Sequence, residues 1–262
     1  QIKTAIQKGA LWLTRGNKTQ RLRKIKKALL PGDTLHFYYN DKVLAQQPEP
    51  AQLIADHQHY SIWYKPYGML SQSSKWSDHC TINRWVETQL TPQRPAFVVH
   101  RLDRAASGLI IIAHSKRANQ AFAQLFSTRQ LQKNYQIISH GKLELEDKTD
   151  GLTVNSPIDD KAALSTFYPK AYHRAADISL IDVNIATGRK HQIRKHAAGL
   201  GVPVVGDRLH GNQQSISDNI NLQLCAVSLS FDCPLTHQHQ SFSLPEPLRP
   251  NLDHVAERLL AQ

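Results

Sequence analysis

The chain has 262 residues, of which 40% are apolar and 20% are charged, a composition typical of a folded protein and unlike that of a disordered one. Its longest strongly apolar stretch, residues 109–113, is far shorter than the roughly 18 residues of a membrane-spanning helix. The formal net charge of +11 indicates a polyanionic partner, usually RNA or DNA.

The positive charge is concentrated at the N-terminus. Nine basic residues and no acidic residue precede Asp33, whereas the rest of the chain carries 23 basic and 21 acidic residues. A block of this kind attracts nucleic-acid phosphates, because their neutralisation releases bound counterions. A merely solvated basic tail or helix face is the alternative.

This N-terminal block has the pattern of a folded unit. Residues 10–13 favour a strand, and Thr19 can cap a helix that we expect to end near Leu30. Three apolar residues in that helix recur at helical spacing and would share one face. A turn at 31–33 and a strand at 34–39 follow. Four basic residues of this helix are predicted to point outward and contact the RNA backbone: Arg21, Arg23, Lys24 and Lys27.

A proline-containing stretch separates the basic block from the rest of the chain. Residues 46–56 include Pro48 and Pro50 and are predicted to form a linker. Residues 1–45 would then be a basic RNA-binding segment, and residues 57–262 would form the main domain.

Short apolar strands outnumber helices in the main domain. We expect helices at 81–90, after Ser115, and from about 187 to 199. Few strands alternate with helices in a regular βαβ order, so we predict an α+β fold with a mixed, mainly antiparallel sheet flanked by helices. The expected strands are residues 60–64, 97–99, 109–113, 133–139, 178–185, 224–231 and 240–244.

The cysteines do not indicate a disulfide framework. Cys80, Cys225 and Cys233 are an odd number without paired spacing, so we interpret them as free thiols in a reducing cytoplasm. His237 and His239 could hold a metal weakly, but a solvated loop is the favoured interpretation, and no metal site is predicted.

The strongest signal for chemistry is the run His100-Arg101-Leu102-Asp103-Arg104, which lies between two apolar strands. Polar residues on a loop held by rigid strands are a common setting for a reactive group. The two arginines are close in sequence to the carboxylate, and neighbouring cations favour its ionised form. An ionised aspartate in a partly dry pocket can act as a nucleophile. An ordinary buried ion pair at a turn is the alternative.

A second basic run covers residues 187–196, at the start of a predicted helix. Cations in the first turns of a helix oppose its dipole. An anion, either a protein carboxylate or an RNA phosphate, should therefore compensate them, unless the basic face is simply solvated.

Several motifs of the chain, taken in sequence order, resemble those of the RluA-type pseudouridine synthases. The run at 100–103 with Ser107-Gly108 resembles the signature of that family. In positions where the family usually has threonine, histidine and tyrosine, this chain has Ala106, Cys225 and His210, which bears on substrate preference more than on chemistry. The other segments that carry the resemblance are residues 65–68, 132–135, 187–196, 201–207 and 222–234.

The resemblance implies the pseudouridine synthase fold and the isomerisation of uridine to pseudouridine in RNA. Ribosomal RNA is the first expectation and transfer RNA the second, and the expected protein is a monomer without an obligatory protein partner. Isomerisation exchanges no electrons and needs no group donor, so no cofactor is implied. Residues 9–16 and 31–33 faintly resemble the small αL-type RNA-binding domain often attached to these enzymes, in which case the opening helix is short or missing here.

The resemblance also implies roles for individual residues. Asp103 would attack the uridine at C1′ of the ribose or at C6 of the base, Arg194 would pair with Asp103, and Tyr135 would stack against the uracil. Arg101 would fill the space left by the flipped nucleotide, because chemistry on a base in structured RNA requires its extrusion. The other residues expected to contact the substrate are His100, Arg104, Arg189 and His191.

Two other functions fit parts of the sequence. A non-catalytic RNA-binding protein would explain the basic block, but it has no need for the set of Asp103, Tyr135 and Arg194. A hydrolase could use Asp103 with His100 or His191, but the chain has neither a Gly-x-Ser-x-Gly elbow nor a glycine-rich phosphate loop.

Overall fold

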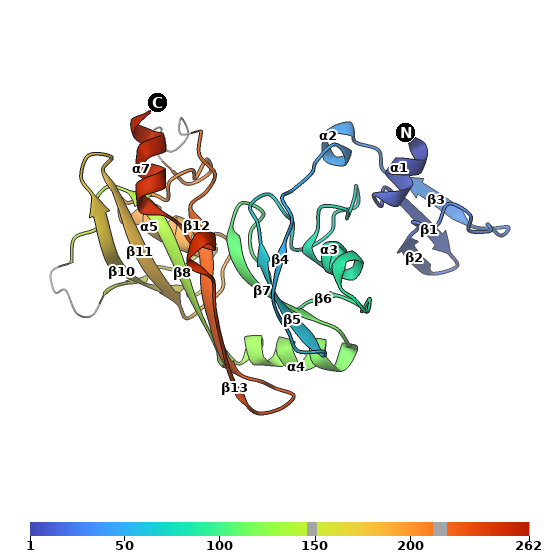
Figure 1. The fold of residues 1–262 in the computed structure, drawn as a ribbon. Coiled ribbons are helices and arrows are strands. Elements are labelled where there is room, and N and C mark those ends of the chain that lie inside the picture. The colour runs from blue at the N-terminus through green and yellow to red at the C-terminus, as the bar shows by residue number, and fades with distance from the viewer. Residues whose placement is uncertain (146–150, 212–218, 262) are drawn as a thin grey trace.

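The computed structural model of the chain describes residues 1–145, 151–211 and 219–261. Its strands form two separate sheets, one of three strands and one of ten. Figure 1 shows the small sheet at one end of the molecule, beside the N-terminus, and the large sheet running through the remainder. Within the described part of the chain, none of the helices combines the length and the apolar character that a transmembrane span requires.

The small sheet belongs to an N-terminal unit with the strand order β2-β1-β3, in which both pairs are antiparallel. Alternation along β1 buries Leu11 and Leu13, which pack against Leu22. The elements of this unit are α1 (Ile2–Gln7), β1 (Leu11–Arg15), β2 (Lys18–Arg21) and β3 (Thr34–Phe37).

The prediction of a helix from Thr19 to Leu30 is wrong. A two-residue turn at 16–17 joins β1 to β2 as a hairpin, with Gly16 in the left-handed region that such a turn favours. Cross-strand pairing therefore extends through residues 18–21, and residues 22–33, all of them described, contain no helix. Of the three apolar residues at helical spacing, one is buried, whereas Ile25 and Leu29 are exposed.

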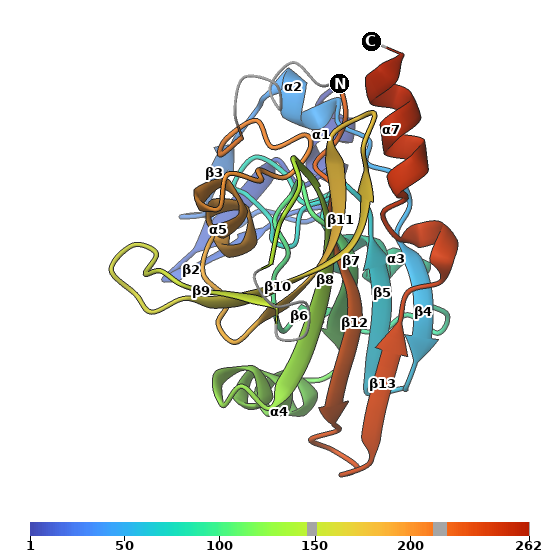
Figure 2. The same cartoon turned by 90° about the vertical axis from the view of Figure 1, so that its left-hand side faces the viewer.

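The large sheet has the order β4-β5-β7-β12-β8-β11-β10-β9, with β6 paired to β7 and β13 paired to β12. Figure 2 shows β5, β7, β12 and β8 side by side along the molecule. Only the β7–β12 pair is parallel among the described strand pairs, so the predicted mixed, mainly antiparallel sheet is confirmed. Its strands are β4 (Gln52–Asp56), β5 (Tyr60–Lys65), β6 (Phe97–Val98), β7 (Ser107–Ala113), β8 (Leu131–His140), β9 (Leu152–Asn155), β10 (Leu164–His173), β11 (Ile178–Ile185), β12 (Leu224–Asp232) and β13 (His239–Ser243).

Helices cover both faces of this sheet. Successive residues of β7 enter different cores, since Ile110 packs in the cluster of α3 and α5, whereas Ile111 packs in the cluster of α4. Thr81 caps α3 and Ser115 caps α4, each by accepting a hydrogen bond from a backbone N–H three residues ahead. The helices are α2 (Asp41–Leu44), α3 (Ile82–Gln89), α4 (Lys116–Ser127), α5 (Gln192–Gly199), α7 (Leu252–Leu260) and a 3-10 turn at Glu246–Leu248.

Part of the predicted linker belongs to the large sheet. Of residues 46–56, the last five form β4, which pairs antiparallel with β5. The division into an RNA-binding segment and a catalytic domain stays a prediction.

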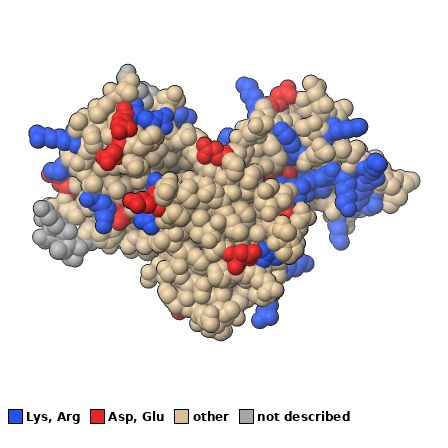
Figure 3. Space-filling view, viewed as in Figure 1, with Lys and Arg blue, Asp and Glu red and all other residues tan. Residues whose placement is uncertain are grey.

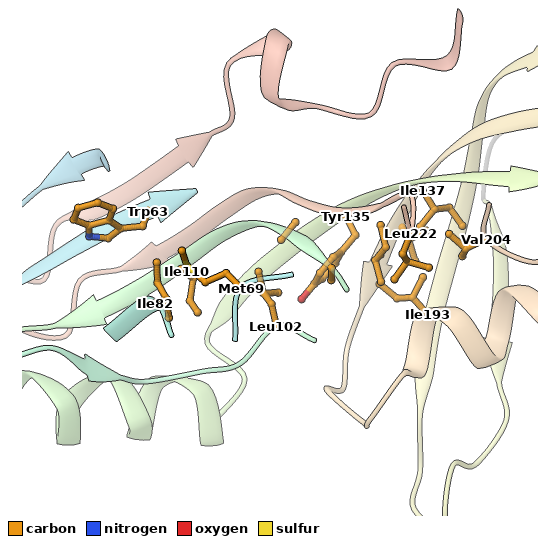
Figure 4. Close-up of a cluster of buried hydrophobic side chains, with 14 of the residues drawn as sticks. Trp63, Met69, Ile82, Leu102, Ile110, Tyr135, Ile137, Ile193, Val204 and Leu222 are labelled. Carbon is orange, nitrogen blue, oxygen red and sulfur yellow. The ribbon is translucent and has the colours of Figure 1, made fainter. Parts of the chain in front are cut away.

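The two halves of the large sheet meet at the parallel pairing of β7 with β12. This joint contains two residue pairs, Ser107 with Cys225 and Gly108 with Ala226. Gly108 has φ +116°, and a Cβ at this position would overlap the backbone of Ala226. Only glycine allows the two strands to approach this closely. One apolar core continues across the joint, from Trp63 to Val204 (Figure 4).

Candidate active site

Asp103 lies on the loop that connects β6 to β7, beside the joint of the sheet. Its carbonyl accepts a hydrogen bond from the N–H of Ala106 at 3.1 Å. The hydroxyl of Ser71 donates to the carbonyl of Leu102 at 2.7 Å and accepts from the N–H of the same residue at 3.1 Å. The loop is therefore fixed on both sides of Asp103, whose side chain is 31% exposed.

A buried lysine supports the same loop. The Lys65 Nζ donates to the carbonyl oxygens of Pro66, Met69 and Ala106 at 3.0, 2.9 and 2.6 Å. Burial lowers the pKa of Lys65 to about 7, although the charge of Asp103 acts in the opposite direction. Sequence reasoning included Lys65 in a motif but missed this support, because its three acceptors are backbone atoms that no sequence pattern displays.

Arg194 on α5 faces two carboxylates. Its Nε and Nη2 donate to the two carboxylate oxygens of Asp207 at 2.8 and 2.5 Å. Its Nη1 lies 3.6 Å from Oδ2 of Asp103. Asp207 thus holds the buried guanidinium in a fixed orientation, with the remaining nitrogen directed toward the more exposed carboxylate.

Asp207 is the functional neighbour that sequence reasoning did not assign. Its side chain is 1% exposed and also accepts hydrogen bonds from the N–H groups of Leu209 and His210. Burial acts to raise the pKa of Asp207, but the hydrogen bonds from Arg194 and from the backbone outweigh it, so the net effect is a lowered pKa. The signal was present in the motif at 201–207, although nothing in it shows that Arg194 is the partner.

A pair of histidines adjoins the same carboxylate. Nε2 of His191 lies 3.8 Å from Oδ2 of Asp103, and its Nδ1 is hydrogen-bonded to Nε2 of His210 at 2.8 Å. Burial lowers the pKa of both imidazoles. Neutral rings therefore prevail at pH 7, and one ring donates its single N–H to the other.

Tyr135 reaches the site from β8, across the joint from Asp103. Its ring is buried between Leu102 and Ile193 (Figure 4). Burial, with a contribution from the charge of Asp103, raises the pKa of Tyr135. The phenol is therefore protonated at neutral pH.

Two cavities meet at Asp103. A cleft of about 490 Å³ is lined by Asp103, Tyr135, His100, Arg101, Arg189 and His191, among others. A second cavity of about 840 Å³ is lined by Asp103 together with Arg101, Arg104, Arg189 and Arg194. The structure thus brings the predicted residues around Asp103, but it divides them, since Arg104 lines the second cavity and Tyr135 lines the first.

His100 forms part of the wall of the first cleft. Its Nε2 accepts a hydrogen bond from the N–H of Ile111 at 3.0 Å, and its ring lies 4.5 Å from that of Phe126. Burial lowers the pKa of His100 far below the usual value of histidine. It therefore contributes shape and not positive charge.

The N-terminal cations separate into two groups. Arg23 forms an ion pair with the buried carboxylate of Asp78, and Arg21 donates to the carbonyls of Gly9 and Ser74. These two arginines, expected at the RNA backbone, instead join the N-terminal unit to the main body. Lys24 is exposed and Lys27 is partly exposed, and Figure 3 shows that basic side chains gather on this end of the molecule.

The three cysteines are buried and free. Among the residues that the structure describes, no three His, Cys, Asp or Glu side chains are grouped so that they could hold a metal ion.

Comparisons with known proteins agree on one family. Residues 59–199 match the model described as RNA pseudouridylate synthase. The dual-specificity RNA pseudouridine synthase RluA of Pasteurella multocida is 31% identical over 71% of this chain and 89% of its own length. The tRNA pseudouridine synthase C of Vibrio cholerae is 30% identical over 76% of this chain and 89% of its own. The solved structure of human RNA pseudouridylate synthase domain containing 1 aligns with a TM-score of 0.61 at 18% identity, covering 81% of this chain and 95% of that one.

Proposed function

Because the chain belongs to the RNA pseudouridylate synthase family and is of the RluA type, converting uridine to pseudouridine in RNA, we propose that Asp103 is its nucleophile and acts on a flipped-out uridine. The observation that carries this proposal is the position of one carboxylate. Asp103 is partly exposed where two cavities meet, 3.6 Å from the guanidinium of Arg194. A charged nucleophile needs this combination of access and electrostatic support.

The reaction moves one bond and one proton. The carboxylate of Asp103 bonds to C1′ of the ribose or to C6 of the base, the N1–C1′ bond breaks, and C5 then bonds to C1′. The proton on C5 leaves, N1 gains a proton, and the carboxylate is released. Arg194 stabilises the carboxylate before attack and after release, and since Asp207 already holds the guanidinium, no reorganisation is needed at those moments.

The pKa of Tyr135 changes during the reaction. While Asp103 is charged, its field and the burial of the ring keep the phenol protonated. Once Asp103 has bonded to the nucleoside, that negative charge is gone and one of the causes of the raised pKa disappears. The phenol packs against the uracil throughout, and its pKa is lower at the stage when the C5 proton must leave, so its ionised, proton-accepting form is then easier to reach.

Access to the uridine requires its extrusion from the RNA, which costs a few kcal/mol. Arg101 is exposed and lines both cavities beside Asp103. A planar guanidinium at this position can stack and donate hydrogen bonds in the space that the base leaves. Arg189 and His191 line both cavities, Arg104 lines the second, and all three contact the substrate around the uridine.

Ribosomal RNA is the proposed substrate class, with transfer RNA second. The relatives include synthases named as dual-specificity and one named for tRNA. The basic N-terminal unit favours a large structured RNA as the substrate, because its cations would contact phosphates beyond the active-site cleft.

The test uses transcripts of ribosomal and transfer RNA that carry tritium at C5 of uridine. Isomerisation replaces the C5–H bond, so active protein releases tritium to water. We expect release from one of these RNAs, and sequencing of the product then locates the modified uridine. Absence of release from both classes of RNA would contradict the proposal.

Replacing Lys24 and Lys27 together by glutamine is expected to weaken RNA binding and to lower the salt slope of log Kd by about 1 per lost phosphate contact. Both lysines are outside the ion pairs that hold the N-terminal unit. Filter binding from low to moderate salt measures the change, with Lys116→Gln on α4 as a control of equal chemistry.

Deleting residues 1–45 would be a less clean experiment. It leaves the buried Asp78 without Arg21 and Arg23, so folding and binding would change together. A double lysine variant with the salt slope of the wild-type protein would remove the N-terminal unit from the proposed RNA contact.

A further inference from the structure

A narrow groove continues from the cleft of Asp103. It has a volume of about 240 Å³ and lies between the end of α4 with the start of β8 on one side and residues 185–189 on the other. Phe126, Lys133 and Arg189 line both this groove and the cleft that contains Asp103 and Tyr135. The two spaces therefore adjoin one another beside the start of β8.

Lys133 is the residue at the junction. It lies two positions before Tyr135 on β8, so both side chains project from the same face of the sheet. Its ammonium lies 5.1 Å from the centroid of the Phe126 ring. Within the described residues, Lys133 has no hydrogen-bond acceptor and no carboxylate partner.

Such a cation is costly to keep. Burial alone lowers the pKa of Lys133 below the usual value of lysine. A partly buried ammonium without a counter-charge destabilises the folded chain, and one aromatic face compensates only a small part of this cost. Because the side chain is partly exposed and has no ionic partner among the described residues, its ammonium is available to bind an anion.

The other charges around the groove have the same sign. Arg129 and Arg189 line it, and Arg101 lines the adjoining cleft. Arg189 uses its Nε to donate to the carbonyl of Ala162 at 3.0 Å, which leaves its terminal nitrogens available. His100 is neutral, and the carboxylate of Asp103 in the adjoining cleft already faces Arg194.

We propose that Lys133, with Arg189 and Arg129, binds an RNA phosphate adjacent to the target uridine. The uridine enters the cleft of Asp103 while its own backbone passes through the basic groove. The phosphate supplies the counter-charge that Lys133 lacks, and it fixes the ribose on which the glycosidic bond is exchanged. This inference rests on the proposed function, because it requires a uridine beside Asp103.

The first test is Lys133→Met, which keeps an unbranched apolar stem and removes the charge. We expect KM for a modified transcript to rise by about 10- to 100-fold, with kcat changed much less, and the salt slope of binding to fall by about 1. Lys133→Arg should restore most of the affinity, whereas Lys116→Met, an exposed lysine at the other end of α4, should behave as wild type. Thermal unfolding of Lys133→Met should occur at or above the wild-type midpoint, because an uncompensated cation has been removed.

The second test identifies the phosphate and uses the wild-type protein. Methylphosphonates, which carry no charge, are placed one at a time near the target uridine of a short RNA substrate. One position next to the uridine should raise KM by a factor similar to that of Lys133→Met, and at that position the variant should show no further loss. If no neutralised phosphate within two nucleotides matters, the inference is overturned, whether or not the variant folds.

Two further results would count against it separately. A Lys133→Met protein with the KM and salt slope of Lys116→Met would overturn the phosphate contact while leaving the isomerase intact. Wild-type protein that binds RNA but releases no tritium would instead overturn the proposed function.

Discussion

Replacing Asp103 by asparagine is expected to lower tritium release from RNA by at least roughly 1,000-fold, since an amide cannot replace the carboxylate as nucleophile. The two side chains have nearly the same shape, and the carboxylate of Asp103 stands 3.6 Å from Nη1 of Arg194 and 3.8 Å from Nε2 of His191, so its contacts in the folded chain are loose. RNA affinity should therefore change by less than about threefold, or rise slightly because a negative charge has left a basic cleft. Single-turnover tritium release and filter binding measure the two effects independently.

The matched control is Asp253→Asn, an exposed aspartate in the first turn of α7. It should retain wild-type turnover. An Asp103→Asn protein with more than about a tenth of wild-type release would assign the nucleophile to another residue. Stronger RNA binding by this variant, combined with a wild-type protein that never isomerises uridine, would favour the non-catalytic RNA-binding function.

Replacing Asp207 by asparagine is expected to lower the free energy of unfolding by about 3–5 kcal/mol, because the guanidinium of Arg194 loses its buried counter-charge. Turnover should fall as well, since Arg194 would be free to turn away from its present orientation toward Asp103. Urea unfolding followed by fluorescence measures the first effect, and tritium release measures the second.

The pH dependence of this loss has a definite sign. The pKa of Asp207 is lower in the folded protein than the value of about 3.9 in an unfolded chain. Its contribution to stability is therefore complete above pH 4 and disappears as the pH falls through the folded-state pKa. The difference in unfolding free energy between wild type and Asp207→Asn should be constant near neutrality and should shrink in acid.

A double variant separates stability from activity. Adding Arg194→Met to Asp207→Asn removes the unpaired cation, and replacement of a whole buried ion pair costs much less than the loss of one partner. We expect unfolding stability to recover in part while turnover stays low, because nothing then stabilises the carboxylate of Asp103. Recovery of both properties would assign to the pair a purely structural role.

The sequence predicts those features that depend on local pattern. The short apolar strands and the helices at 81–90 and after Ser115 are encoded in a few neighbouring residues, and the structure has them. The meeting of Asp103 with Arg194 followed from the order of motifs in a family resemblance, and not from the spacing of the two residues. The geometry places the two side chains together, although their roles stay proposals.

What the sequence could not supply depends on contacts between distant segments. Arg23 pairs with Asp78, which is 55 positions away, so an apparently RNA-binding arginine is committed to the fold. Lys133 is one of many lysines in the sequence, and only when β8 is placed beside the groove is it visible that no described residue is its ionic partner. The wrong prediction of a helix after Thr19 has the same origin. The local periodicity favoured a helix, but pairing with β1 makes the start of this segment a strand.

The narrow joint between β7 and β12 also determines how the enzyme can be divided. Asp103 precedes β7 in the chain, whereas Tyr135 and Arg194 follow β7. Apolar clusters extend across the joint, and neither piece carries a complete set of reacting groups. A chain split into these two pieces should show no turnover as separate fragments and should regain it only when the fragments reassociate. Isomerisation would then report directly on their reassociation.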